Sequence, residues 1–140
     1  MTGNPIYKTA HIQLATFVGG PMAIIYVIAE NYKQLGSPEK IRKTWILGIA
    51  AFILFVGIAL SIPREWHIPT LVIPLLSLSF GAAIMQATQG AAIKNHIEEG
   101  GQVFSLWRSL GIGVVSLLMT ILLITLVAFI AVGLGFKIKA

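Results

Sequence analysis

Three polar side chains stand at the end of an apolar run in the stretch "MQATQGAAIKNHIEEGG", residues 85–101. Gln86, Thr88 and Gln89 carry amide and hydroxyl groups, which donate and accept hydrogen bonds without ionising at neutral pH. Inside a membrane they could line a polar cavity or bind a partner. At the point where a helix leaves the membrane, they would only form its polar end.

Small residues accompany these polar side chains at helical spacing. Ala83, Ala87 and Ala91 recur at every fourth position, and Gln86 and Gly90 form the row beside them. Stripes of small residues let two membrane helices approach closely, and amides hydrogen-bond across such contacts for about 1 kcal/mol. We therefore expect a packed helix-helix seam here. A cavity or partner-binding groove lined by the three polar side chains is the functional alternative.

Glu30 is the carboxylate nearest the middle of an apolar segment, and Asn31 follows it. Inside the membrane, a carboxyl group could carry protons. Because Lys33 lies close by, we expect Glu30 instead in the headgroup region, in an ion pair with Lys94 or Arg108. Glu30 and Asn31 are both candidate intramembrane or partner-binding residues.

The composition indicates an integral membrane protein. Of 140 residues, 56% are hydrophobic and 11% are charged, and the mean hydropathy is +0.87. Soluble domains carry about 25% charged residues. The net charge of +5 does not indicate nucleic-acid binding, because the basic residues are scattered at the ends of apolar runs rather than gathered on one face.

Four stretches are long and apolar enough to span about 30 Å of hydrocarbon as helices. We predict these spans at about 12–34, 43–62, 70–95 and 106–136. Residues 1–140 would then form a single all-α transmembrane domain, a polytopic bundle of four helices.

"GGP" interrupts the first predicted span. Pro21 lacks an amide donor and frees the carbonyl of Phe17, and Gly19 and Gly20 precede it. Broken helices with free carbonyls bind ions in some transporters. No acidic residue lies in the middle of any predicted span, so we expect a purely structural kink.

Turn residues predict two antiparallel helix hairpins. Gly36 suits the left-handed position after a helix, while Ser37 and Pro38 suit the start of the next. Gly100 and Gly101 would end the third helix in the same way.

The two halves of the chain also resemble each other weakly. Asn31 precedes Gly36 as Asn95 precedes Gly100, and "KTWILGI" resembles "RSLGI". A duplicated hairpin and chance similarity between apolar helices both account for this match.

Basic residues predict the orientation, because cytoplasmic loops are enriched in Lys and Arg. We expect the loops 35–42 and 96–105 in the cytoplasm and both termini outside. The loop side would hold six basic residues, Lys33, Lys40, Arg42, Lys43, Lys94 and Arg108, and the other side four, Lys8, Arg64, Lys137 and Lys139.

Catalysis and metal binding find little support in the sequence. The chain has no Asp and no Cys, and its glycines form no phosphate-binding loop. His11 and His67 are expected on the outer face and His96 on the inner one. His96 and Glu99 could share a helix face, but two ligands rarely suffice for a metal. We predict no enzymatic activity, no cofactor and no metal.

Several segments resemble those of small bacterial membrane proteins: "FVGGPMA", "NYKQLG", "GAAIKNHIEEGG" and "WRSLGIG". These proteins are four-helix integral membrane proteins with no assigned function. The resemblance implies a bacterial inner membrane location and no activity or ligand.

These observations favour a protein that acts by binding. The first hypothesis is a non-enzymatic accessory subunit or toxin-immunity protein that contacts a membrane-protein partner within the bilayer. The second is a small homo-oligomeric transporter or channel whose path is lined by Gln86, Thr88, Gln89 and Glu30. Neither involves nucleic acid.

Overall fold

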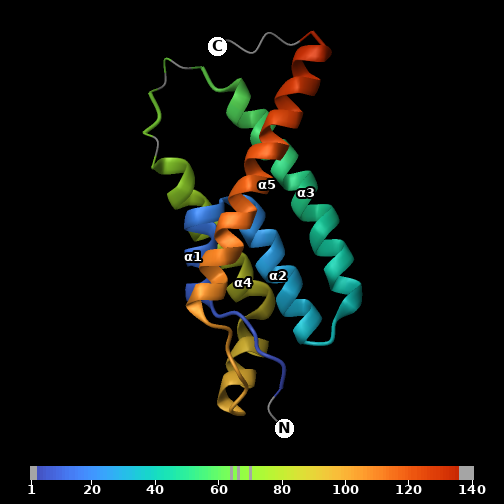
Figure 1. Cartoon of the computed structure of the whole chain (residues 1–140), viewed down its shortest axis with the longest axis vertical. Helices are drawn as coiled ribbons and strands as arrows, with labels where there is room; N and C mark the ends of the chain where they lie inside the picture. Colours follow the sequence, from blue (N-terminus) through green and yellow to red (C-terminus); the bar gives the residue numbers. More distant parts are fainter. Residues whose placement is uncertain (1–2, 64, 66, 70, 136–140) are drawn as a thin grey trace.

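The computed structural model describes residues 3–63, 65, 67–69 and 71–135, and the helices in this part of the chain are shown in Figure 1. They are α1 (Thr9–Gly19), α2 (Pro21–Gln34), α3 (Pro38–Ser61), α4 (Val72–Glu98) and α5 (Leu106–Gly133). No strand occurs among the described residues, where the one β-bridge joins Ile6 to Val103. The predicted all-α class is confirmed.

Three helices, not four, are long and apolar enough to cross a membrane. These are α3, α4 and α5, with candidate spans Pro38–Ala59, Val72–Glu98 and Leu106–Gly133. They agree with the predicted spans 43–62, 70–95 and 106–136 to within a few residues, although Thr70 and Phe136 lie outside the described residues.

The predicted first span, 12–34, is wrong, because the chain reverses within it. Gly20 has φ +69°, a left-handed conformation that favours glycine, and Pro21 begins a new helix at its first position. The expected kink at Gly19, Gly20 and Pro21 is therefore a complete turn. At 1.5 Å per residue, α1 and α2 are only about 16 and 21 Å long, so neither spans about 30 Å.

Hydrogen bonds hold α1 and α2 antiparallel. Tyr7, just before α1, donates its backbone N–H to Asn31 Oδ1 near the end of α2 over 2.7 Å, and Asn31 Nδ2 donates to the Tyr7 carbonyl over 2.9 Å. The start of α1 and the end of α2 therefore lie at the same end of the molecule, as they would in a re-entrant hairpin, the name we use for this pair.

The expected location of both termini on one side is consequently wrong. The N-terminal segment lies beside the α4–α5 connection, where Ile6 N–H donates to the Gln102 carbonyl over 3.1 Å and Phe104 N–H to the Ile6 carbonyl over 3.0 Å. The end of α5 lies at the opposite end of the molecule (Figure 1). Three membrane-crossing helices, an odd number, would place the two termini on opposite sides.

The two predicted hairpins differ in the structure. The turn between α2 and α3 forms as expected, with Gly36 at φ +71° and the Ser37 N–H bonded to the Tyr32 carbonyl over 2.9 Å. Gly100 also ends α4 with φ +78°. However, α4 and α5 do not pack against each other, because both pack against α1. The two halves therefore do not share one structure, contrary to the suggested duplication.

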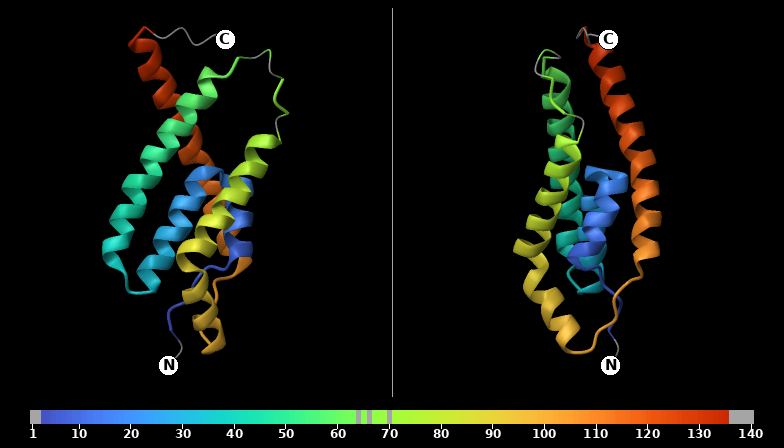
Figure 2. Two further views of the ribbon diagram at one scale, coloured as in Figure 1. Left: turned by 180° about the vertical axis from the view of Figure 1, so that it is seen from behind. Right: turned by 90° about the vertical axis from the view of Figure 1, so that its left-hand side faces the viewer.

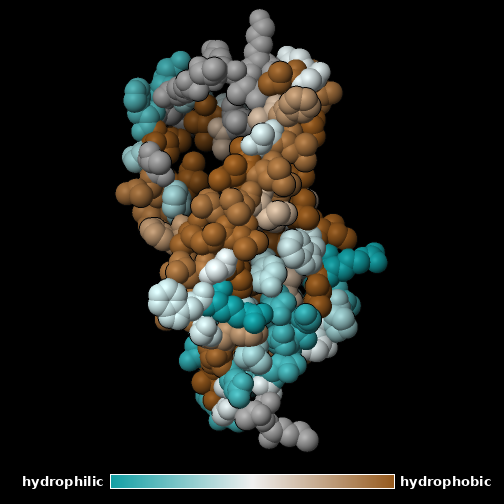
Figure 3. Space-filling model, in the orientation of Figure 1, coloured by the Kyte–Doolittle hydropathy of each residue, from teal (hydrophilic) through white to brown (hydrophobic). Residues whose placement is uncertain are grey.

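The re-entrant hairpin forms the core, although it is the part that does not cross. Figure 2 shows α1 and α2 between α5 on one side and α3 and α4 on the other. Helix α2 buries eight residues: Met22, Ala23, Ile24, Ile25, Val27, Ile28, Ala29 and Asn31. The long helices leave most of their apolar side chains exposed, and Figure 3 shows these side chains over much of one face. This pattern suits surroundings of lipid.

Helices α1 and α5 approach closely through small residues. A Cβ on Gly113 would lie 2.8 Å from Val18 Cβ and 3.1 Å from the Ala15 carbonyl oxygen. Thr120 Oγ1 donates to the Gly19 carbonyl over 3.0 Å, which satisfies a carbonyl at the chain reversal. Helix α5 therefore packs closely against α1 and also donates a hydrogen bond to the turn that follows it.

Gly113→Ala should destabilise the protein by about 1–3 kcal/mol, because the methyl group overpacks the α1–α5 contact. Gly111→Ala is the matched control on the same helix, since a Cβ there meets nothing within 4 Å. It should be neutral or stabilise by up to about 1 kcal/mol. Thermal unfolding in detergent measures both variants, and equal effects would contradict the close packing.

Single cysteines at Asn4, Glu39 and Glu65, all exposed, test the re-entrant topology. The natural chain has no cysteine, so labelling by an impermeant maleimide reports one site at a time. Asn4→Cys and Glu39→Cys should react from the same side of the membrane, and Glu65→Cys from the other. If Asn4→Cys and Glu39→Cys react from opposite sides, the first segment crosses the membrane.

Candidate functional site

A buried amide pair joins α2 to α4. Gln89 is 1% exposed and Asn31 is fully buried. Asn31 Nδ2 donates to Gln89 Oε1 over 3.1 Å, and Gln89 Nε2 donates to the Ile28 carbonyl over 2.9 Å. Asn31 also holds both backbone groups of Tyr7. Because these amide groups are already bonded within the chain, the pair is a structural clamp.

Tyr7, which is bonded to Asn31 of the clamp, also belongs to a polar cluster where the N-terminal segment meets α5. Arg108 Nε donates to the Tyr7 hydroxyl over 2.7 Å, and its guanidinium carbon lies 4.1 Å from the centroid of the Phe104 ring. Burial raises the pKa of the Tyr7 hydroxyl, although the bonded guanidinium opposes this shift. Tyr7 therefore stays neutral at physiological pH.

His11 ties the same segment to the α4–α5 connection. Its Nδ1 accepts the Lys8 backbone N–H over 3.2 Å, and its Nε2 lies 2.7 Å from the Phe104 carbonyl, to which it can only donate. This pair of partners requires the neutral ring with its proton on Nε2. Burial lowers the pKa of His11, which favours the same form.

Sequence reasoning missed Tyr7, Phe104 and the role of Arg108. Tyr7 and Arg108 are 101 positions apart, and no local pattern connects them. A break at "GGP" that turns the chain back is the one signal that would have brought residue 7 next to residue 31 and both next to the α4–α5 connection.

Gln86 and Thr88 point away from the clamp. Both are exposed: Gln86 Nε2 donates to Thr9 Oγ1 over 2.9 Å, and Thr88 Oγ1 donates to the Ile84 carbonyl of its own helix over 2.7 Å. The three polar residues of the predicted site thus lie on different faces of α4, and only Gln89 is buried.

The predicted small-residue seam is wrong for contacts inside this chain. Ala83, Ala87 and Ala91 are all exposed, and Gly90 is half-buried beside Gln86. The buried stripe of α4 lies on another face of the helix and consists of Ser77, Gly81, Met85, Gln89 and Ile93.

Glu30 makes local contacts instead of the expected pair with Lys94 or Arg108. It accepts from Gln34 Nε2 over 2.9 Å and lies 4.0 Å from Lys33 Nζ. Lys94 pairs with Glu98 over 3.7 Å. The hydrogen bond and the ion pair of Glu30 are therefore both formed with residues of its own helix, α2.

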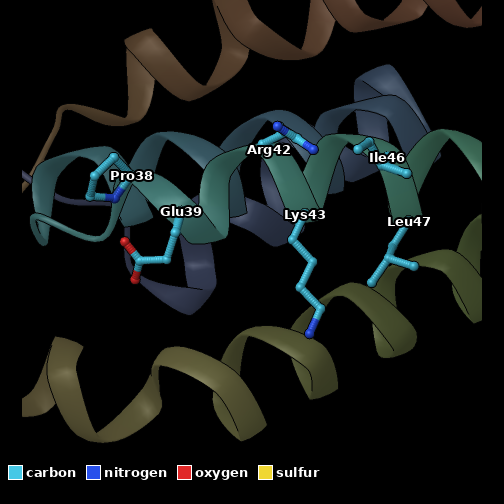
Figure 4. A pocket seen from close by; sticks show the side chains of 6 residues that line it. All are labelled: Pro38, Glu39, Arg42, Lys43, Ile46 and Leu47. Atoms are coloured by element: carbon cyan, nitrogen blue, oxygen red, sulfur yellow. The ribbon is translucent and has the colours of Figure 1, made fainter.

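An open groove lies between α3 and α4, with α2 as its floor. It has a volume of about 430 Å³, and its lining includes Ile24, Ile25 and Ile28 of α2, Lys40 and Lys43 of α3, and Ile84 and Thr88 of α4. A more open hollow of about 520 Å³ runs along the first turns of α3 (Figure 4).

No group of three or more potential metal-ligating side chains is found in the described part of the chain. His11 and His96 both lie at the end that carries the α4–α5 connection, since His96 Nε2 is 3.0 Å from the Gln102 carbonyl. The expected placement of His11 on the face opposite His96 is wrong, because α1 starts on this side.

Comparison with protein-family models, curated proteins and solved structures finds no match to this chain. The resemblance to small bacterial membrane proteins therefore stays a prediction.

Asn31→Leu should destabilise the protein by roughly 2–4 kcal/mol, because it strands the Tyr7 N–H and Gln89 Oε1 in a buried place. Asn95→Leu is the matched control, since Asn95 is exposed at the corresponding position of α4. It should change stability by no more than about 0.5 kcal/mol. Unfolding in detergent measures the stability of both variants. Similar losses of stability would contradict a stabilising role for the buried hydrogen bonds of Asn31.

Proposed function

We propose that this chain is a non-enzymatic integral membrane protein that acts by binding a partner protein within the bilayer, through the outward face of α4. The observation that carries the proposal is the exposure of Ala83, Ala87 and Ala91, a small-residue stripe that the chain does not use for its own packing.

The physical argument is the difference between this face and ordinary lipid-facing surface. Lipid favours large apolar side chains no less than small ones, whereas a second helix gains close packing only over small ones. The exposed surface of α5 carries large residues instead, such as Leu118, Leu122 and Phe129. On α4, the exposed amide of Gln86 lies near the stripe and offers a hydrogen-bonding group. The partner is thus a membrane helix that presents small or hydrogen-bonding residues.

The proposed setting is the bacterial inner membrane, with the connections 35–37 and 99–105 in the cytoplasm. Lys8 directly precedes α1, whose His11 bonds to the α4–α5 connection, so Lys8 joins the six basic residues that the sequence assigns to this end. Arg64, Lys137 and Lys139 lie outside the described residues. The revised count strengthens the charge bias that supports this orientation. An accessory subunit or an immunity protein against a membrane-active toxin fits this arrangement.

A photo-crosslinking amino acid at Ala87 tests the proposal in native membranes. We expect one protein adduct of defined mass, because a bound helix would lie against this position. The same amino acid at Leu118, exposed on α5, is the control and should give lipid adducts only. Equal protein crosslinking from both positions, or none from Ala87, would contradict a binding face on α4.

A homo-oligomeric transporter or channel is the second candidate, and two observations favour it. Irregular backbone inside a membrane is typical of transporters and channels, where it lines a path. In addition, Thr16 Oγ1 and Ser109 Oγ are buried without a hydrogen-bond partner among the described residues, and water could serve them. The proposed lining residues do not support one path, because Gln89 is buried and bonded to Asn31 and Ile28, whereas Gln86 and Thr88 are exposed on other faces of α4. Solute or ion flux into liposomes that contain the purified protein would favour this candidate.

A further inference from the structure

The groove between α3 and α4 is open to the bilayer along its side. The two helices do not contact each other, because α3 packs mainly on α2 while α4 packs mainly on α1. Figure 2 shows α2 set back between them. The groove is therefore open along the side where the membrane would surround α3 and α4.

The lining of the groove changes from basic to apolar with depth. Lys40 and Lys43 lie in the first turns of α3, at the end where the chain leaves the membrane. Further along, Ile24 and Ile25 of α2 form the floor with Leu47 of α3. This gradient matches an amphiphile whose anionic head lies at the membrane surface and whose tail points inward.

Both lysines are available for an anion. The ion pairs among the described residues are Lys33–Glu30 and Lys94–Glu98, so neither groove lysine takes part in one. Glu39 is one turn before Lys43 but forms no such pair with it. Figure 4 shows Lys43 projecting from α3 toward α4, while Arg42 lies on the other side of α3. Lys40 Nζ lies 5.4 Å from the centroid of the Tyr32 ring, which holds its charge at the groove entrance.

We infer that this groove binds one anionic phospholipid, with an acyl chain along the α2 floor and the phosphate between Lys40 and Lys43. Charge complementarity selects the headgroup, and the apolar floor takes the chain. This inference goes beyond the proposed function, because it concerns another ligand and a different face of α4.

The lining of the groove favours a lipid over a protein helix as its occupant. The two lysines at the groove entrance suit an anionic headgroup, and the isoleucines behind them suit an acyl chain.

Competition between two lipids on the purified full chain tests the inference. Native mass spectrometry in mild detergent would compare equal amounts of phosphatidylglycerol and phosphatidylcholine with identical acyl chains. Each lysine near a phosphate contributes about a fivefold preference, so the first bound lipid should be phosphatidylglycerol by roughly 25-fold.

Charge variants distinguish binding at this site from a general attraction between basic residues and anionic lipids. Lys40→Gln combined with Lys43→Gln should remove the preference, while Arg42→Gln, one position away on the same helix, should keep it. All three side chains are exposed, so folding should not suffer. An unchanged preference in the double variant, or an equal loss in Arg42→Gln, would overturn the inference.

A bulky side chain introduced into the groove tests whether an acyl chain lies there. Thr88→Trp should lower the occupancy of both lipids by blocking the groove, and Leu118→Trp, exposed on α5 and not part of the groove lining, should leave it unchanged. If Thr88→Trp changes the oligomeric mass but not lipid occupancy, the groove holds another protein chain and the inference is wrong. Loss of the crosslink from Ala87 with intact lipid selectivity would count against the proposed function alone.

Discussion

A chain reversal enclosed by three long apolar helices constrains everything around it. Lipid supplies no hydrogen bonds, so the backbone groups at the turn need partners from the protein. Gly20 N–H bonds to the Thr16 carbonyl over 2.8 Å, Thr120 of α5 serves the Gly19 carbonyl, and Pro21 brings no N–H to satisfy. The turn is thus possible only because α5 covers it.

This requirement explains why the shortest helices are the most buried. The hairpin of α1 and α2 must be enclosed, and the three long helices enclose it from two sides. Because they pack inward on the hairpin rather than on one another, each long helix keeps a wide face toward the bilayer. The open groove between α3 and α4 and the free small-residue face of α4 both follow from this arrangement.

The polar residues of α4 divide into two sets with different roles. Gln89 turns inward and, through Asn31, fastens the returning end of the hairpin to α4. Gln86 and Thr88 stay at the surface, close to the faces for which we propose ligands. One cluster in the sequence therefore serves both the stability of the fold and the surface available for binding, since successive residues of a helix point in different directions.

The sequence by itself determined what depends on local chemistry. Apolar length predicted α3, α4 and α5, and Gly36 and Gly100 predicted the ends of α2 and α4, because a span and a helix stop are encoded by neighbouring residues. Only the tertiary structure decided whether "GGP" kinks the first segment or reverses it. The two outcomes share the same glycines and proline and differ in distant contacts, such as Tyr7 with Asn31 and Thr120 with Gly19. Contacts between the hairpin and α4, such as that of Asn31 with Gln89, decided which face of α4 is buried, since a helix rich in small residues on several sides carries no local preference for one of them.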